Sequence, residues 1–216
     1  MLINSSMGNK SKKLLKDFIE HLDTFYKDLG VFGTTQERQD VAREICNRFY
    51  SNLVSLENHL LLKDSLSAAL IQRYNHELVV DFYYLLDPSD KENKTEKFFN
   101  HSHDSVAREW STLPSKEKRA FVPPWVADDK GLVSIYKILS NMAHPNIISI
   151  RLNRRGKESE YKIIKGAITL CIVEISSCIN HKIFRDLFPN ISWISVLERN
   201  QILHSRAVSF LSEIDT

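Results

Sequence analysis

The chain has 216 residues, of which 43% are hydrophobic and 26% are charged, and its formal net charge at pH 7 is +2. This length is enough for one well-packed domain, and the composition is ordinary for a globular protein. A net charge this small argues against a dedicated nucleic-acid binder, so any contact with RNA has to come from local clusters of Lys and Arg.

Helical periodicity dominates the chain, after eleven N-terminal residues that we expect to form a disordered tail. The predicted helices span residues 12–29, about 34–60, 65–86, about 129–144, about 166–187 and about 191–214. Residues 89–120 are polar and weakly amphipathic, and we expect them to cover one side of a bundle.

One segment has the pattern of strands instead of a helix. Residues 147–152 and 160–164 are apolar runs on either side of a basic turn, which predicts a small β-hairpin near 147–164. The fold class is therefore mainly α, a multi-helix bundle with one small hairpin. We expect a helical pair at 12–60 to pack on a core bundle at 61–216, as one compact domain.

The three cysteines, Cys46, Cys171 and Cys178, lack the spacing of metal ligands. Cys171 and Cys178 are seven residues apart in a predicted helix, about 10 Å along its axis, which is too far for a disulfide. We expect reduced, buried thiols in a cytoplasmic protein. We expect no signal peptide, and no membrane span, because the apolar stretch 167–179 is short and contains Glu174.

The predicted helix 65–86 is apolar on most sides, so we expect it at the centre of the bundle. Arg73 and Glu77 lie one turn apart on it, where an ion pair would be partly desolvated. Tyr136, Ser140 and His144 share a face of the predicted helix 129–144 and could complete a polar pocket with that pair. The alternative is a structural polar network that fixes the packing of two helices.

These residues carry a first resemblance. Arg73-x-x-x-Glu77, followed by Tyr136-x-x-Leu139-Ser140 and then His144-Pro145, resembles a bacterial helical family of unknown function, over roughly residues 65–165. The resemblance implies a helical fold and a shared polar site, and it names no reaction.

The segment Arg199-Asn200-Gln201-Ile202-Leu203-His204 carries a second one. An arginine, a following Asn and a histidine five positions after the arginine resemble the active-site motif of HEPN ribonucleases. This resemblance implies metal-independent RNA cleavage at a site formed where two protomers meet. It gives His204 the role of general base or acid, Arg199 that of stabilising the phosphate, and Asn200 that of orienting one of them.

The same six residues also fit an ordinary amphipathic helix with His204 at the border of its apolar stripe. Arg199 and His204 lie about 140° apart around a straight helix. They can therefore meet at one phosphate only if Arg199 bends round the helix or if two protomers combine.

Two basic clusters are candidates for contact with RNA, and a solvated tail and an exposed turn are the alternative interpretation of them. The clusters are Lys10, Lys12 and Lys13, and Arg151, Arg154, Arg155 and Lys157. His101, His103 and Asp104 could ligate a metal, but we expect an exposed segment there and predict no metal and no cofactor.

The leading hypothesis is a HEPN-like endoribonuclease, a homodimer of the kind used as a toxin or against phage, with RNA and an antitoxin or other protein as partners. The competing hypothesis is a non-catalytic helical interaction protein with a buried Arg–Glu–His network. A third is a degenerate HEPN fold that dimerises without cleaving RNA.

Overall fold

A computed structural model of the chain describes residues 3–30, 37–62, 64–88 and 157–212. Their helices are α1 (Ile3–Asp28), α2 (Glu37–Leu62), α3 (Ser65–Leu85), α10 (Lys157–Asn180), α11 (Lys182–Leu187) and α12 (Trp193–Ser212). The predicted helix 129–144 and the first strand of the predicted hairpin lie outside the described residues.

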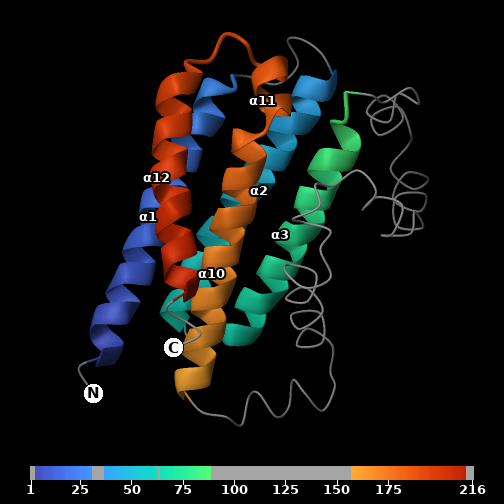
Figure 1. Cartoon of the computed structure of the whole chain (residues 1–216). Coiled ribbons are helices and arrows are strands. Elements are labelled where there is room, and N and C mark those ends of the chain that lie inside the picture. Colours follow the sequence, from blue (N-terminus) through green and yellow to red (C-terminus); the bar gives the residue numbers. More distant parts are fainter. Residues whose placement is uncertain (1–2, 31–36, 63, 89–156, 213–216) are drawn as a thin grey trace, which may run out of the picture.

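The long helices lie side by side along a common direction, with α10 between α3 and α12 (Figure 1). α10 contacts α1, α2, α3 and α12, so it is the central helix of the described bundle. α12 runs antiparallel to both α10 and α1, and the start of α1 lies at the same end of the bundle as the end of α12 (Figure 1). The mainly α class is confirmed.

Local signals set several helix ends. α1 ends at Asp28 and is followed closely by Gly30, whose φ of 78° is a left-handed conformation that glycine adopts at little cost. α3 begins after Asp64, whose side chain accepts a hydrogen bond of 3.0 Å from the backbone N–H of Ser67. The cap is one residue earlier than Ser65, the residue that the sequence pattern favours.

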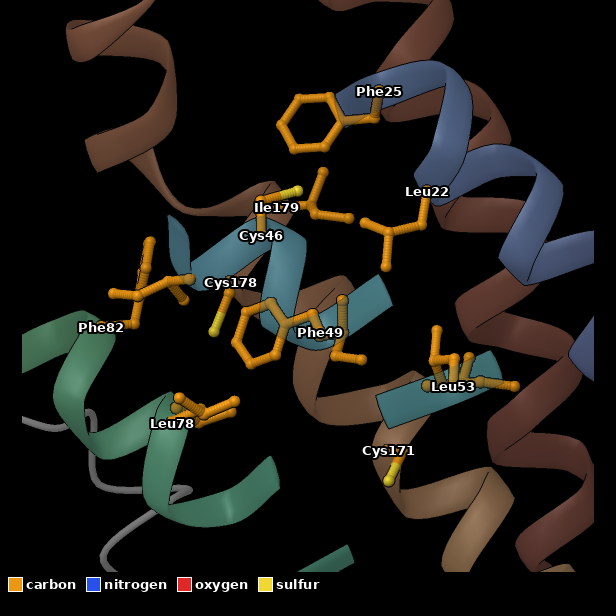
Figure 2. Close-up of a cluster of buried hydrophobic side chains, with 14 of the residues drawn as sticks. Leu22, Phe25, Cys46, Phe49, Leu53, Leu78, Phe82, Cys171, Cys178 and Ile179 are labelled. Carbon is orange, nitrogen blue, oxygen red and sulfur yellow. The ribbon is translucent and has the colours of Figure 1, made fainter. Parts of the chain in front are cut away.

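The core is built from the inward faces of α1, α2, α3 and α10 (Figure 2). Phe184 of α11 joins them, because its ring lies 5.3 Å from that of Phe25 and 5.1 Å from that of Phe82, between ring centroids. Burying each such aromatic side chain stabilises the fold by about 1.5 to 3 kcal/mol. All three cysteines are buried in this core and free of disulfides, as expected.

The second strand of the predicted hairpin is wrong, because residues 160–164 belong to α10. Ile164, Ala167, Ile168 and Cys171 are buried at spacings of three and four residues, so a helical apolar face continues through the segment. Packing of that face overrides the β propensity of Tyr161, Ile163 and Ile164. Residues 147–156 lie outside the described ranges.

Two other boundaries differ from expectation. α1 begins at Ile3, so most of the segment expected to be a tail is helical, and Ser11 is buried within the bundle. The helix predicted at 166–187 is two helices, since α10 ends at Asn180 and the side chain of His181 caps α11.

Within α10, the segment Lys162–Asn180 is long and apolar enough to cross a membrane by length and composition alone. In the bundle, 72% of that window is buried against other parts of the chain, which is also typical of a core helix.

Candidate functional site

The motif that resembles HEPN ribonucleases lies in the middle of α12, and its three residues have different surroundings. Arg199 is exposed, Asn200 is completely buried, and His204 is partly buried. Asn200 faces α10 and α1, because Val196, Leu203 and Ala207, which share its side of the helix, are also buried.

Asn200 anchors α12 to α10. Its Nδ2 donates one hydrogen bond of 2.8 Å to the carbonyl oxygen of Ser176 and another of 2.8 Å to Oδ1 of Asn180. Both donors of the amide are therefore used inside the chain, and Asn200 has no contact with solvent. It can act on a bound molecule only through the position it gives to α12.

A second histidine, His21 of α1, lies beside this anchor. Its side chain is buried, and its Nε2 has no well-aligned hydrogen-bond partner within the described residues. Burial and the positive charge of Arg199 lower the pKa of His21 to about 4, and the neighbouring side-chain amide of Asn200 opposes them only in part. The imidazole is therefore neutral at pH 7.

Arg199 and His204 lie on opposite flanks of the buried face of α12. Asn200 and Leu203, which separate them around the helix, are 0% and 3% exposed. Arg199 is on the flank toward α1, because its charge acts on His21. Within one protomer the two side chains diverge, in keeping with their separation of about 140° around the helix.

His204 has the protonation state that a general base needs. Burial lowers its pKa below the ordinary value of 6.5, so the imidazole is neutral at pH 7. Its Nδ1 has no hydrogen-bond partner within the parts of the chain described here.

The Arg73–Glu77 pair predicted from the sequence is present on α3, with Nε of Arg73 3.2 Å from Oε1 of Glu77. The two side chains are 28% and 45% exposed, so the pair lies toward the surface and not at the centre of the bundle. Tyr136, Ser140 and His144, the residues expected to complete this pocket, lie outside the described ranges.

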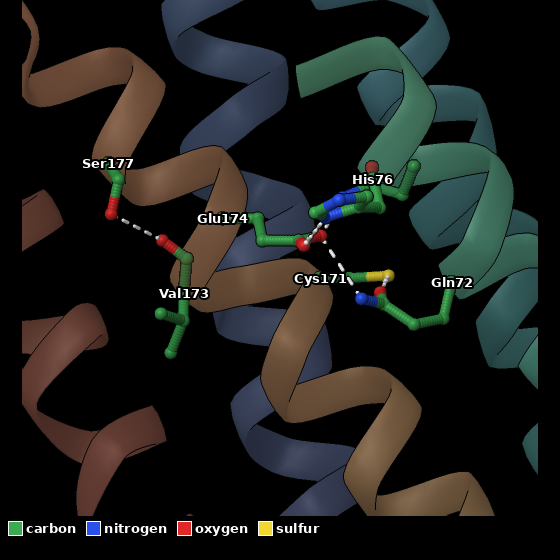
Figure 3. A network of polar contacts seen from close by, with 7 residues as sticks. Gln72, His76, Cys171, Val173, Glu174 and Ser177 are labelled. Carbon is green, nitrogen blue, oxygen red and sulfur yellow. Dashed lines mark hydrogen bonds and ion pairs between the residues drawn. The ribbon is translucent and has the colours of Figure 1, made fainter. Parts of the chain in front are cut away.

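A different set of polar residues occupies the interior between α3 and α10 (Figure 3). Glu174 of α10, with no exposed surface, accepts hydrogen bonds of 3.1 Å from Nδ2 of Asn75 and of 3.1 Å from Nε2 of Gln72. Nδ1 of His76 lies 2.7 Å from its other carboxylate oxygen. The thiol of Cys171 donates to Oε1 of Gln72 at 2.6 Å.

This Glu174 network is the polar cluster that sequence reasoning missed. Its signal was present as one carboxylate in the apolar stretch 167–179, opposite three polar residues spaced at helical intervals on α3. A buried carboxylate requires such partners, because leaving it unpaired in the interior costs several kcal/mol. The network ties α3 to α10 and is closed to solvent.

The side chains of the other residues predicted to contact RNA, near the start of α10, are not described. Arg151, Arg154 and Arg155 lie outside the described ranges, and Lys157 is the first residue of α10, without a described side chain. Among the described residues, no group of three or more His, Cys, Asp or Glu side chains is placed to hold a metal ion.

Comparisons of the chain with models of protein families, with curated protein sequences and with solved structures found no match.

Proposed function

We propose that this protein is a HEPN-like, metal-independent endoribonuclease that acts as a homodimer in the cytoplasm. The observation that supports the proposal most directly is the pairing of an exposed Arg199 with a neutral, partly buried His204 on one helix. A guanidinium suits a phosphate, and a neutral imidazole suits a hydroxyl that has to lose a proton. A role as a toxin or anti-phage effector, with an antitoxin or other protein partner, follows from the resemblance alone.

The proposed reaction uses the RNA's own 2′-hydroxyl. The imidazole of His204 accepts the proton of that hydroxyl, the 2′-oxygen forms a bond to the adjacent phosphorus, and the bond from phosphorus to the 5′-oxygen breaks. The departing 5′-oxygen takes a proton from water. Arg199 stabilises the additional negative charge of the pentacoordinate phosphate.

The placement of the two side chains supports a composite site. Arg199 and His204 mark the two edges of the outward face of α12, and this face carries the exposed apolar residues Ile194, Ile202 and Val208. Ile194 and Ile202 are 76% and 61% exposed, so a second surface on this face would bury apolar area. A second copy that covers this face would allow Arg199 to meet the partner subunit's His204.

Asn200 has a positional role in this proposal. Its two hydrogen bonds to α10 fix the rotation of α12 about its axis and thereby the directions in which Arg199 and His204 point. The residue is needed for the geometry of the site without touching RNA.

A complementation experiment tests both the chemistry and the composite site. Purified protein is incubated with single-stranded and structured RNA in the presence of EDTA, and Arg199→Ala and His204→Ala are assayed separately and as a mixture. Each variant alone should lose cleavage. Mixed dimers retain one intact site of two, so an equilibrated mixture should recover about a quarter of the wild-type rate.

The outcomes separate the hypotheses. Cleavage that is lost in both variants and not recovered on mixing would place the site within one protomer. Persistence of cleavage in His204→Ala together with its loss in His144→Ala would move the chemistry to the residues predicted around Arg73 and Glu77. Absence of cleavage by the wild-type protein would refute the nuclease.

The alternative is a non-catalytic helical interaction protein with a buried polar network. It is supported by the closed Glu174 network and by the exposed apolar residues at the junction of α2 and α3. These are Leu61, Leu62, Leu66, Leu70 and Tyr74.

A further inference from the structure

The N-terminal half of α1 carries a concentration of positive charge that the net charge of the whole chain conceals. Lys10, Lys12, Lys13 and Lys16 are all exposed on this helix. The first acidic residue of the chain is Asp17. Because this segment is helical and packed on the bundle, its lysines have fixed positions and are not spread along a tail.

An ion pair shows which of these lysines face α12. Nη1 of Arg206 on α12 lies 2.8 Å from Oδ2 of Asp17 on α1. Lys10 and Lys13 precede Asp17 by seven and four residues, which places them on the same side of α1 at about 100° per residue. Lys12 is turned away from that side by about 140°.

α12 continues the row of positive charge. Arg199 and Arg206 are seven residues apart, so they lie on one flank of α12, about 10 Å apart along its axis. Because α12 runs antiparallel to α1 (Figure 1), the order along the junction is Arg199, Arg206, Lys13, Lys10. Two carboxylates of α1 lie on the same side, Asp17, which is paired with Arg206, and the exposed Glu20 at the Arg199 end.

We propose that this row, Lys10, Lys13, Arg206 and Arg199, is a binding surface for the phosphate backbone of single-stranded RNA. The row is about 20 Å long by helix rise, which spans several consecutive phosphates. The inference rests on the proposed function for its substrate, since it leads the strand to Arg199, the residue assigned to the scissile phosphate. It explains how a chain with a net charge of +2 holds a polyanion.

Binding is measured by the fluorescence anisotropy of an end-labelled single-stranded RNA 20-mer, in EDTA, with the full chain carrying His204→Ala to prevent cleavage. The test variant adds Lys10→Ala and Lys13→Ala. The matched control adds Lys27→Ala and Lys182→Ala, which remove the same charge from two exposed lysines at the opposite end of the bundle.

The test variant should bind about tenfold more weakly at 100 mM salt, because two phosphate contacts are lost. The slope of log K against log salt should decrease in magnitude by about 1.4, at about 0.7 per contact on single-stranded nucleic acid. The control pair should leave both quantities unchanged. Equal effects of the two pairs, or no effect of either, would overturn the proposal. So would lysine-dependent binding to phosphatidylserine vesicles without lysine-dependent binding to RNA.

This result is independent of catalysis. Lysine-dependent binding of RNA without cleavage by the wild-type protein would support the surface and refute the nuclease. Cleavage of RNA by the wild-type protein would support the nuclease. If the Lys10→Ala and Lys13→Ala substitutions then changed neither the affinity for RNA nor its salt dependence, the surface would be refuted.

Discussion

Two polar regions of the bundle, each formed by α10 with a neighbouring helix, differ in how far their residues reach the surface. Between α3 and α10, Glu174 is fully buried and accepts hydrogen bonds from Gln72 and Asn75. Between α10 and α12, Asn200 is fully buried too, but the residues on either side of it reach the surface. The first region joins two helices, whereas the second joins two helices and also presents groups to solvent.

The difference lies in which groups can be reached from solvent. The carboxylate of Glu174 has partners on both oxygens. Both regions keep a buried polar atom without a hydrogen-bond partner within the described residues, Oδ1 of Asn75 in the first and Nδ1 of His204 in the second. In the second region that atom belongs to a partly buried His204, five residues from the exposed Arg199 on the same helix, whereas Asn75 in the first region is completely buried. This contrast favours the α12 region as the functional one.

The largest expected effect comes from breaking the closed network. Glu174→Ala leaves the side-chain amides of Gln72 and Asn75 buried without their acceptor, and it should lower the free energy of unfolding by about 3 to 5 kcal/mol. Urea denaturation monitored by circular dichroism measures this loss. Glu198→Ala, which removes an exposed carboxylate from α12, is the control and should change stability by less than about 0.5 kcal/mol. Similar losses in the two variants would show that the buried Glu174 contributes no more to stability than an exposed carboxylate does.

The next largest effect is a pH dependence of the stability, which comes from His21 beside Asn200. The pKa of His21 is about 4 in the folded chain against an ordinary 6.5, so the unfolded chain binds more protons between these values. The resulting stability is fully present above pH 6.5 and is lost as the pH falls toward 4. Its size is about 2 to 3 kcal/mol.

Comparison with His21→Gln isolates this contribution. Thermal unfolding of both proteins from pH 7.5 to pH 4 should show a smaller loss of stability in the variant. The lowered pKa values of His181 and His204 act equally on both proteins and cancel in the difference. Parallel curves would mean that the pKa of His21 is not lowered in the folded chain.

Much of the fold could be predicted from the sequence, because helix periodicity and local caps are short-range signals. The helices at α2, α3 and α12 lie within a few residues of their predicted bounds. The prediction of a strand at 160–164 is wrong because packing of the apolar face of α10, which extends well beyond this segment, outweighs the β propensity of its residues. Periodicity over a longer window would have favoured the helix.

The polar network predicted from the sequence lies one position away from the observed network on α3. The pattern placed Arg73 and Glu77 at the centre, while the buried polar residues are their neighbours Gln72 and His76. A shift of one residue turns a helix face by about 100°, and a helix that is apolar on most sides does not show which face is the innermost. The partner, Glu174, is 98 residues from His76 in sequence, a pairing that no local pattern can indicate.

A smaller effect is expected at the anchor of α12. Asn200→Asp keeps the size of the side chain but replaces both donors with a second carboxylate oxygen, which faces the carbonyl oxygen of Ser176. We expect a loss of about 2 kcal/mol in the free energy of unfolding. Asn180→Ala removes one of the two acceptors and should cost less. An Asn200→Asp protein as stable as the wild type would show that α12 is held by its apolar face alone.

The smallest effect is expected at the surface pair that the sequence pattern singled out. Arg73 and Glu77 are 28% and 45% exposed, so solvent screens their attraction and each gains little from the other. A double-mutant cycle with Arg73→Ala and Glu77→Ala, read by urea denaturation, should give a coupling of about 0.5 kcal/mol or less. The same cycle applied to His76 and Glu174, with His76→Ala and Glu174→Ala, should give several times more, because no water replaces the lost partner in the interior. A surface coupling as large as the buried one would remove the contrast between the two regions. It would then favour Arg73 and Glu77 as the wall of an enclosed pocket.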